Sequence, residues 1–298
     1  MVRADYTRAV DVTTPDRRTL AVTEAGDPQG KPILVHHGTP SSGSYVPPML
    51  DELAREQSVR LIAYDRPGYG GSTRDEGRTV ADCVDDVHAI ADALALEQFA
   101  SWGISGGGPH VLACAARCDD RLAAVASLAS VAPYEAEGLV WLAGMGEDNI
   151  EEFGAVVDGS DALHRFLAPV REGHMRAEPE QIVEIMQTLL GPEDRAVLTG
   201  EFARDVLEAG KAGLVHGYDG WFDDDVAFCR PWGFDIAEID RPVLLLHGDD
   251  DRFVPVGHGH WLAERIPGVE ARIDPNDGHL TLMARRVREA HEWLLARL

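Results

Sequence analysis

The chain has 298 residues, and its 27 basic and 51 acidic side chains give a formal net charge of −24 at pH 7. A charge this negative argues against nucleic acid and anionic membranes as partners, so we expect a small-molecule substrate without high negative charge. Hydrophobic residues make up 45% of the sequence, enough for a packed core, and no apolar run approaches the length of a membrane span.

The N-terminal residues contain no apolar segment of the secretory type, which predicts a cytoplasmic protein. The four cysteines show neither metal-binding nor disulfide spacing, and we expect buried thiols in a reducing compartment. They are Cys83, Cys114, Cys118 and Cys229. No sequence feature calls for a cofactor or a metal ion.

The first half of the chain alternates between predicted strands and helices. Residues 5–13 and 18–25 alternate polar and apolar side chains and predict an antiparallel pair of strands. The next predicted elements are a strand at 32–38, a helix at 49–56, a strand at 59–64 and an amphipathic helix at 79–96. This rhythm indicates a parallel sheet covered by helices on both faces, with catalytic loops at the carboxyl ends of its strands.

The segment 99–117 passes from an apolar strand through Gly-Ile-Ser-Gly-Gly into an alanine-rich helix. Gly-x-Ser-x-Gly between a strand and a helix is typical of a nucleophile elbow, which marks Ser105 as a candidate nucleophile. The turn is so sharp that Ser105 should have a positive φ. A side chain at Gly103 or Gly107 would collide with the neighbouring backbone.

After a predicted strand at 122–128, strand-like runs disappear between residues 134 and 234. We expect a helical insertion there, with helices at 138–145, 149–157, 162–170, 179–190 and 195–209. The strand pattern resumes at 241–248, followed by a helix at 259–265, a strand at 269–273 and a closing helix at 282–298. The predicted core therefore comprises residues 1–133 and 235–298, and the predicted cap comprises residues 134–234.

A serine nucleophile requires a carboxylate and a histidine later in the chain. Three consecutive aspartates, Asp249, Asp250 and Asp251, follow the resumed strand, and His279 follows the last strand. The chemistry alone does not distinguish among the three aspartates, and Glu135 is the first substitute if the acid lies elsewhere.

The remaining histidines that stand near motifs have simpler interpretations. We expect His110, on the helix after the elbow, to be packed or to cap that helix. His258 and His260 are too close in sequence to share a helix face, which makes a metal pair improbable. The histidines that precede glycines at strand ends are expected to be structural, and they are His36, His37 and His247.

Taken together, these motifs resemble the α/β-hydrolase fold with a helical cap, in its serine-dependent esterase or iminopeptidase-like branch. The matching segments run in the same order as in that family: residues 37–40 (His-Gly-Thr-Pro), 65–72 (Asp-Arg-Pro-Gly-Tyr-Gly-Gly-Ser), 103–107, 247–255 and 278–279. The resemblance implies a mostly parallel eight-stranded sheet. The dehalogenase and epoxide-hydrolase branches carry aspartate at the nucleophile position, so Ser105 disfavours them.

The resemblance also implies roles for individual residues. The His-Gly-x-x-Asp spacing selects Asp251 as the acid that supports His279, and Thr39 and Gly106 would donate the N–H groups of an oxyanion hole. The implied activity is hydrolysis of a carboxylic ester, lactone or thioester of a small, largely uncharged substrate. An iminopeptidase, a cofactor-free perhydrolase, a lyase and a non-catalytic ligand receptor remain open as alternatives.

Overall fold

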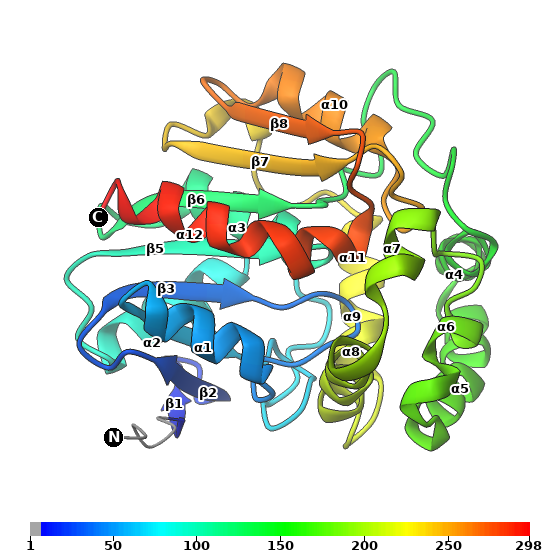
Figure 1. The fold of residues 1–298 in the computed structure, drawn as a ribbon, viewed down its shortest axis with the longest axis horizontal. Coiled ribbons are helices and arrows are strands. Elements are labelled where there is room, and N and C mark those ends of the chain that lie inside the picture. The colour runs from blue at the N-terminus through cyan, green and yellow to red at the C-terminus, as the bar shows by residue number, and fades with distance from the viewer. Residues whose placement is uncertain (1–6) are drawn as a thin grey trace.

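Eight strands form a single sheet in the computed structural model, which describes residues 7–298 (Figure 1). The strands are β1 (Arg8–Thr13), β2 (Thr19–Gly26), β3 (Lys31–His36), β4 (Val59–Tyr64), β5 (Phe99–Ile104), β6 (Leu122–Leu128), β7 (Val243–Gly248) and β8 (Glu270–Asp274). Their order across the sheet is β1-β2-β4-β3-β5-β6-β7-β8. Residues 5 and 6 of the first predicted strand lie outside the described residues.

The sheet is mostly parallel, as predicted. Pairings from β4 through β3, β5, β6 and β7 to β8 are all parallel, whereas β2 pairs antiparallel with both β1 and β4. Every residue of β7 is buried, because helices cover both faces of a sheet of this kind. The carboxyl ends of β3, β5, β6, β7 and β8 therefore meet at one edge.

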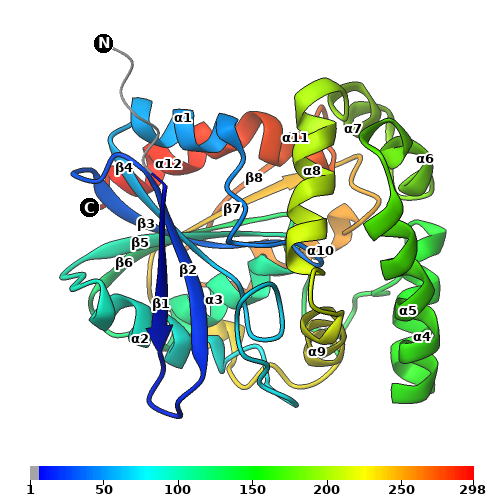
Figure 2. The same cartoon turned by 90° about the horizontal axis from the view of Figure 1, so that it is seen from below.

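Helices cover both faces of the sheet, as predicted (Figure 2). On one face, α1 (Pro48–Glu56) and α12 (Val287–Leu295) pack against strands from β2 to β6. On the other face lie α2 (Cys83–Ala93), α3 (Gly107–Arg117) and α10 (Val256–Arg265). The short α11 (His279–Thr281) joins α12 through a π-helical turn, Leu282–Arg286, so the predicted closing helix at 282–298 is interrupted.

The helices between β6 and β7 stand beside the carboxyl ends of the strands (Figure 1). They are α4 (Glu147–Asp158), α5 (Ser160–Arg176), α6 (Ile182–Ile185), α7 (Pro192–Val197), α8 (Gly200–Gly213) and α9 (Asp219–Phe228). The limits of the cap at residues 134 and 234 stay a prediction. In the described part of the chain, no helix combines the length and the apolar character needed to cross a membrane.

Several predicted helix limits were wrong. Residues 138–145 form turns rather than a helix, because Gly138 and Gly144 adopt φ values of +84° and +94°. The predicted helix at 79–96 is reduced to α2, and the one at 179–190 breaks into short pieces. The helix α9 was not predicted at all, since its run of Asp223, Asp224 and Asp225 has poor helix propensity.

Candidate active site

Ser105 occupies a tight turn between β5 and α3. Its φ is +55°, as predicted, which is a strained conformation for a residue with a Cβ. A Cβ on Gly103 would lie 2.6 Å from the carbonyl carbon of Gly107, and a Cβ on Gly107 would lie 2.7 Å from that of His36. The two glycines therefore allow β3, β5 and α3 to approach closely enough to form the turn.

Asp251 and His279 are in direct contact. The Nδ1 atom of His279 lies 2.8 Å from Oδ2 of Asp251. The other carboxylate oxygen of Asp251 accepts the N–H groups of Phe253 and Val254, at 2.9 Å and 2.7 Å. Asp249 is exposed and Asp250 is partly exposed, 3.9 Å from Arg252. Of the three aspartates, Asp251 is the one that contacts His279.

The environment of His279 favours its protonated form. Burial lowers the pKa of His279, but the charge and the hydrogen bond of Asp251 outweigh burial, so the net pKa is raised above the usual value. Phe253 stacks on the imidazole, with ring centroids 4.4 Å apart. An imidazole held in this way can take up a proton and be stabilised as imidazolium by Asp251.

Asp194, at the start of α7, holds the backbone that carries His279. Its carboxylate accepts the N–H groups of His279, Leu280 and Thr281 at 2.9 Å, 2.7 Å and 3.1 Å. Asp194 is fully buried, and burial raises its pKa. No sequence pattern marked this residue, because 85 positions separate it from His279.

Ser105 lies on the walls of two adjoining cavities. The first, of about 190 Å³, is lined by Ser105 and His279 together with mostly apolar side chains, among them Val46, Met49, Trp102, Phe202 and Met283; we call it the apolar cavity. The second, of about 370 Å³, is lined by Ser105 and Gly106 together with Asp148, Glu151, Glu152 and Asp225; we call it the acidic cavity. Thr39 lines both cavities.

Thr39 and Gly106 lie next to each other beside Ser105. A Cβ on Gly106 would be only 2.7 Å from the Cβ of Thr39, so the loop after β3 packs directly on the start of α3. Backbone N–H groups at a helix start favour negative charge. The two residues predicted as oxyanion donors are thus neighbours of the candidate nucleophile.

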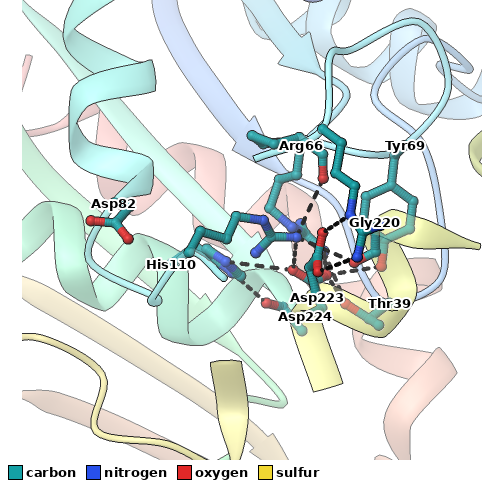
Figure 3. A network of polar contacts seen from close by, with 12 residues as sticks. Thr39, Arg66, Tyr69, Asp82, His110, Gly220, Asp223 and Asp224 are labelled. Carbon is teal, nitrogen blue, oxygen red and sulfur yellow. Dashed lines mark hydrogen bonds and ion pairs between the residues drawn. The ribbon is translucent and has the colours of Figure 1, made fainter. Parts of the chain in front are cut away.

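The side chain of Thr39 belongs to a buried polar network centred on Asp224 of α9 (Figure 3). Asp224 Oδ2 accepts hydrogen bonds from Thr39 Oγ1 at 2.6 Å, Arg66 Nη2 at 2.6 Å and Tyr69 Oη at 2.9 Å. Arg78 Nη2 lies 2.7 Å from Asp224 Oδ1. Since Arg66 and Tyr69 follow β4, the network connects α9 to the loops at the carboxyl edge of the sheet.

Two positive charges keep Asp224 ionised. Burial alone would raise the pKa of Asp224, but Arg66 and Arg78 hold it well below its usual value. Arg66 and Asp224 are fully buried, and Arg78 is nearly so. The network therefore places two guanidinium groups and one carboxylate out of contact with water, beneath the loop that carries Thr39.

Comparison with known proteins agrees with this architecture. Residues 31–285 match the family described as alpha/beta hydrolase fold. The chain belongs to this family. A solved alpha/beta hydrolase fold protein from Nakamurella multipartita superimposes with a TM-score of 0.69 at 26% identity, covering 96% of this chain and 99% of that chain.

Two curated relatives illustrate the range of the family. The bifunctional esterase/perhydrolase DCH of Acinetobacter calcoaceticus is 29% identical over 249 residues, covering 82% of this chain and 83% of the relative. The pimeloyl-[acyl-carrier protein] methyl ester esterase of Xanthomonas campestris pv. campestris (strain B100) is 27% identical over 274 residues, covering 90% of this chain and 96% of the relative.

Most of the other histidines that stand near the sequence motifs of this hydrolase-fold chain lie in structural contacts. His110 Nδ1 lies 2.7 Å from the Gly106 carbonyl oxygen, and burial lowers the pKa of His110 to about 3. His37 Nε2 accepts the N–H of Arg66, and His258 contacts the backbone of Ala132 and Trp141. His36 and His247 are also fully buried, whereas His260 is exposed.

Glu135 lies away from the candidate active site. It lines a surface cavity of about 760 Å³ together with Arg117, Trp232 and Trp261, and Ser105 is not among the residues that line that cavity. This position, together with the contact between Asp251 and His279, leaves no geometric reason to prefer Glu135 as the acid.

Proposed function

We propose that this chain is a serine hydrolase that cleaves a carboxylic ester, lactone or thioester through an acyl-enzyme. The observation that carries the proposal is the 2.8 Å contact between His279 and Asp251 at the cavity where Ser105 sits on its strained turn. Membership of the alpha/beta hydrolase fold family and the esterases among its relatives support hydrolysis of esters in general.

In the proposed acylation step, Oγ of Ser105 attacks the carbonyl carbon of the ester while Nε2 of His279 takes the hydroxyl proton. Asp251 keeps the imidazole in the required tautomer and stabilises the imidazolium. The tetrahedral intermediate then collapses, the C–O bond to the leaving group breaks, and His279 returns its proton to the departing alkoxide. An acyl group bound to Ser105 remains.

Deacylation repeats the sequence with water as the nucleophile. His279 takes a proton from the water, the tetrahedral intermediate forms again, and the carboxylic acid leaves as Ser105 regains its proton. The N–H groups of Thr39 and Gly106 would bind the oxyanion in both steps. A single donor of this kind contributes on the order of 10²–10³ in rate in enzymes where it has been removed.

Hydrolysis of p-nitrophenyl butyrate by the purified chain and by its Ser105→Ala variant tests the proposal. We expect turnover by the wild type, a burst of p-nitrophenol equal to the enzyme concentration where deacylation is slow, and loss of turnover in the variant. Ala retains a Cβ at the same positive φ, so the variant should fold like the wild type. Turnover that survives unchanged in Ser105→Ala would contradict the proposal.

A further inference from the structure

Two carboxyl groups face each other on the helical side of the acidic cavity. Glu152 lies on α4 and Asp225 on α9, and their carboxyl groups are within hydrogen-bonding reach. Trp221 Nε1 donates to Oε1 of Glu152 at 2.5 Å. Trp221, Asp225 and Phe228 all line the cavity, and their spacing of four and three residues puts them on one face of α9.

Three other buried carboxylates are compensated by cations or N–H donors. Asp224 is paired with two arginines, Asp194 accepts three backbone N–H groups, and Asp251 accepts two N–H groups besides contacting His279. Asp225 is different: it is 1% exposed, and within residues 7–298 no donor reaches its Oδ2. A buried carboxylate oxygen without a donor or a cation is costly, and Trp221 is a neutral donor, so something must compensate the negative charge of this pair.

A shared proton provides that compensation when the cavity is empty. Burial raises the pKa of Glu152 to about 7, with Asp148 adding to the shift while the hydrogen bonds from Asp225 and Trp221 oppose it. Burial and the neighbouring Glu152 raise the pKa of Asp225 well above its usual value. At neutral pH the pair therefore holds at least one proton, which a cationic ligand could replace.

We propose that Glu152 and Asp225 form a subsite for a protonated amine, so that the preferred ester of this hydrolase carries an ammonium group. The inference rests on the proposed function for the position of the scissile bond. It replaces the expectation of a largely uncharged substrate with that of a cationic one, because an uncharged ester would leave the two carboxyl groups with nothing to bind.

The rest of the cavity wall favours an ammonium group over other cations. Among the described residues that line it there is no Lys or Arg, and His174, its one basic side chain, has a pKa lowered by burial. The described residues bring no three metal-ligating side chains together, which disfavours a divalent ion. Trp221 and three phenylalanines supply aromatic faces that attract organic cations, and these are Phe153, Phe166 and Phe228.

The charged groups around the pair also favour a cation. Asp148 and Glu151 of α4 line the same cavity, and Asp224 precedes Asp225 on α9. The thiol of Cys229 also feels the negative charge of both carboxyls, but burial is the main cause of its pKa of about 12, so it stays neutral. Asp224 is neutralised by its arginines. Among the described residues that line the cavity, His174 is the one group whose protonation would oppose a cation.

Inhibition by benzylammonium tests the inference, and benzyl alcohol serves as a neutral probe of equal size. The test does not depend on whether the acyl part or the alcohol part of the ester carries the ammonium group. Both compounds are titrated against hydrolysis of p-nitrophenyl butyrate at pH 8. We expect competitive inhibition by benzylammonium with an inhibition constant at least tenfold below that of benzyl alcohol. The advantage should shrink at pH 6, where the cation must displace a proton from Glu152. Equal inhibition constants at pH 8 would overturn the inference.

Two variants test whether Glu152 and Asp225 cause the preference for benzylammonium over benzyl alcohol. Glu152→Gln and Asp225→Asn should each bring the ratio of the two inhibition constants close to one, a readout that is independent of how much activity each variant keeps. Glu147→Gln, an exposed position on the same helix α4 outside the cavity wall, should keep the wild-type ratio. A ratio that is unchanged in both cavity variants would also overturn the inference.

The amine subsite can be tested separately from the proposed hydrolase activity. If the wild type hydrolyses no ester, isothermal calorimetry with benzylammonium and benzyl alcohol replaces the kinetic assay. The missing hydrolysis would contradict the proposed hydrolase. Tighter binding of benzylammonium than of benzyl alcohol, lost in Glu152→Gln, would still support the subsite. Equal calorimetric affinities would overturn the subsite itself.

Discussion

Replacement of Asp224 by asparagine removes the one negative charge that lies between two buried guanidinium groups. Asp224 accepts hydrogen bonds from Arg66, Tyr69 and Thr39 at 2.6–2.9 Å, and Arg78 lies 2.7 Å away. Asn keeps the shape and one acceptor oxygen, but Arg66 and Arg78 both lose the carboxylate with which they are paired. Breaking one partner of a buried ion pair costs about 3–5 kcal/mol of folding free energy.

That cost translates into a large fall in melting temperature. Because the entropy of unfolding grows with chain length, one kcal/mol shifts the midpoint of a chain of 298 residues by about 1.5–2 °C, so Asp224→Asn should melt roughly 5–10 °C below the wild type. Thr39 then donates to a neutral amide oxygen in place of a carboxylate oxygen, and displacement of its loop should lower kcat for p-nitrophenyl butyrate by up to about 10²-fold. Differential scanning calorimetry at one scan rate, followed by the kinetic assay well below the midpoint, measures both effects.

The matched control is Asp219→Asn on the same helix. The Asp219 side chain is 52% exposed and lies 3.3 Å from Arg74, so its loss should cost about 0–1 kcal/mol. If Asp224→Asn melts as high as Asp219→Asn and keeps the wild-type kcat, the buried network neither stabilises the fold nor supports the loop of Thr39.

Three further predictions concern the groups around His279. Asp251→Asn should lower kcat for p-nitrophenyl butyrate by about 10²–10⁴-fold and Asp250→Asn should change it little, since Asp251 contacts the imidazole; equal effects of both variants would place the acid elsewhere. The kcat/KM of the wild type should fall as the pH drops through the raised pKa of His279, because a protonated imidazole cannot act as a base. In Asp251→Asn the residual activity should persist to lower pH, since the carboxylate that raises this pKa is gone while burial still lowers it. A wild-type profile that stays flat through the raised pKa would contradict a role for His279 as base. Asp194→Ala removes the acceptor of three N–H groups and should lower both the melting temperature and kcat, and unchanged kcat would show that Asp194 does not position His279.

Local steric requirements made part of the site predictable. Strands buried on both faces consist largely of apolar residues, and the apolar segments at 59–64 and 122–128 mark the observed limits of β4 and β6. The nucleophile turn is specified within five residues, because the space around Gly103 and Gly107 excludes a Cβ. The fold and the position of Ser105 could therefore be predicted from short segments.

Residues that act through distant partners could not be predicted. Asp224 contacts Arg66 over 158 positions, and Asp194 contacts His279 over 85 positions. In the sequence, Asp223, Asp224 and Asp225 form a charged run typical of an exposed surface. In the structure all three are buried, and arginines pair with Asp223 and Asp224. None of the matching sequence motifs falls within residues 134–234, whereas in the structure this segment supplies Asp194, Asp224 and the pair of Glu152 and Asp225.

Covalent labelling by a fluorophosphonate, followed by peptide mapping with mass spectrometry, tests the assignment of the nucleophile most directly. A serine activated by a neighbouring imidazole attacks the phosphorus and retains the label. We expect one adduct per chain, on Ser105, that is lost in Ser105→Ala and forms far more slowly in His279→Ala. No adduct on the folded wild type, or an adduct on another residue that persists in Ser105→Ala, would contradict it.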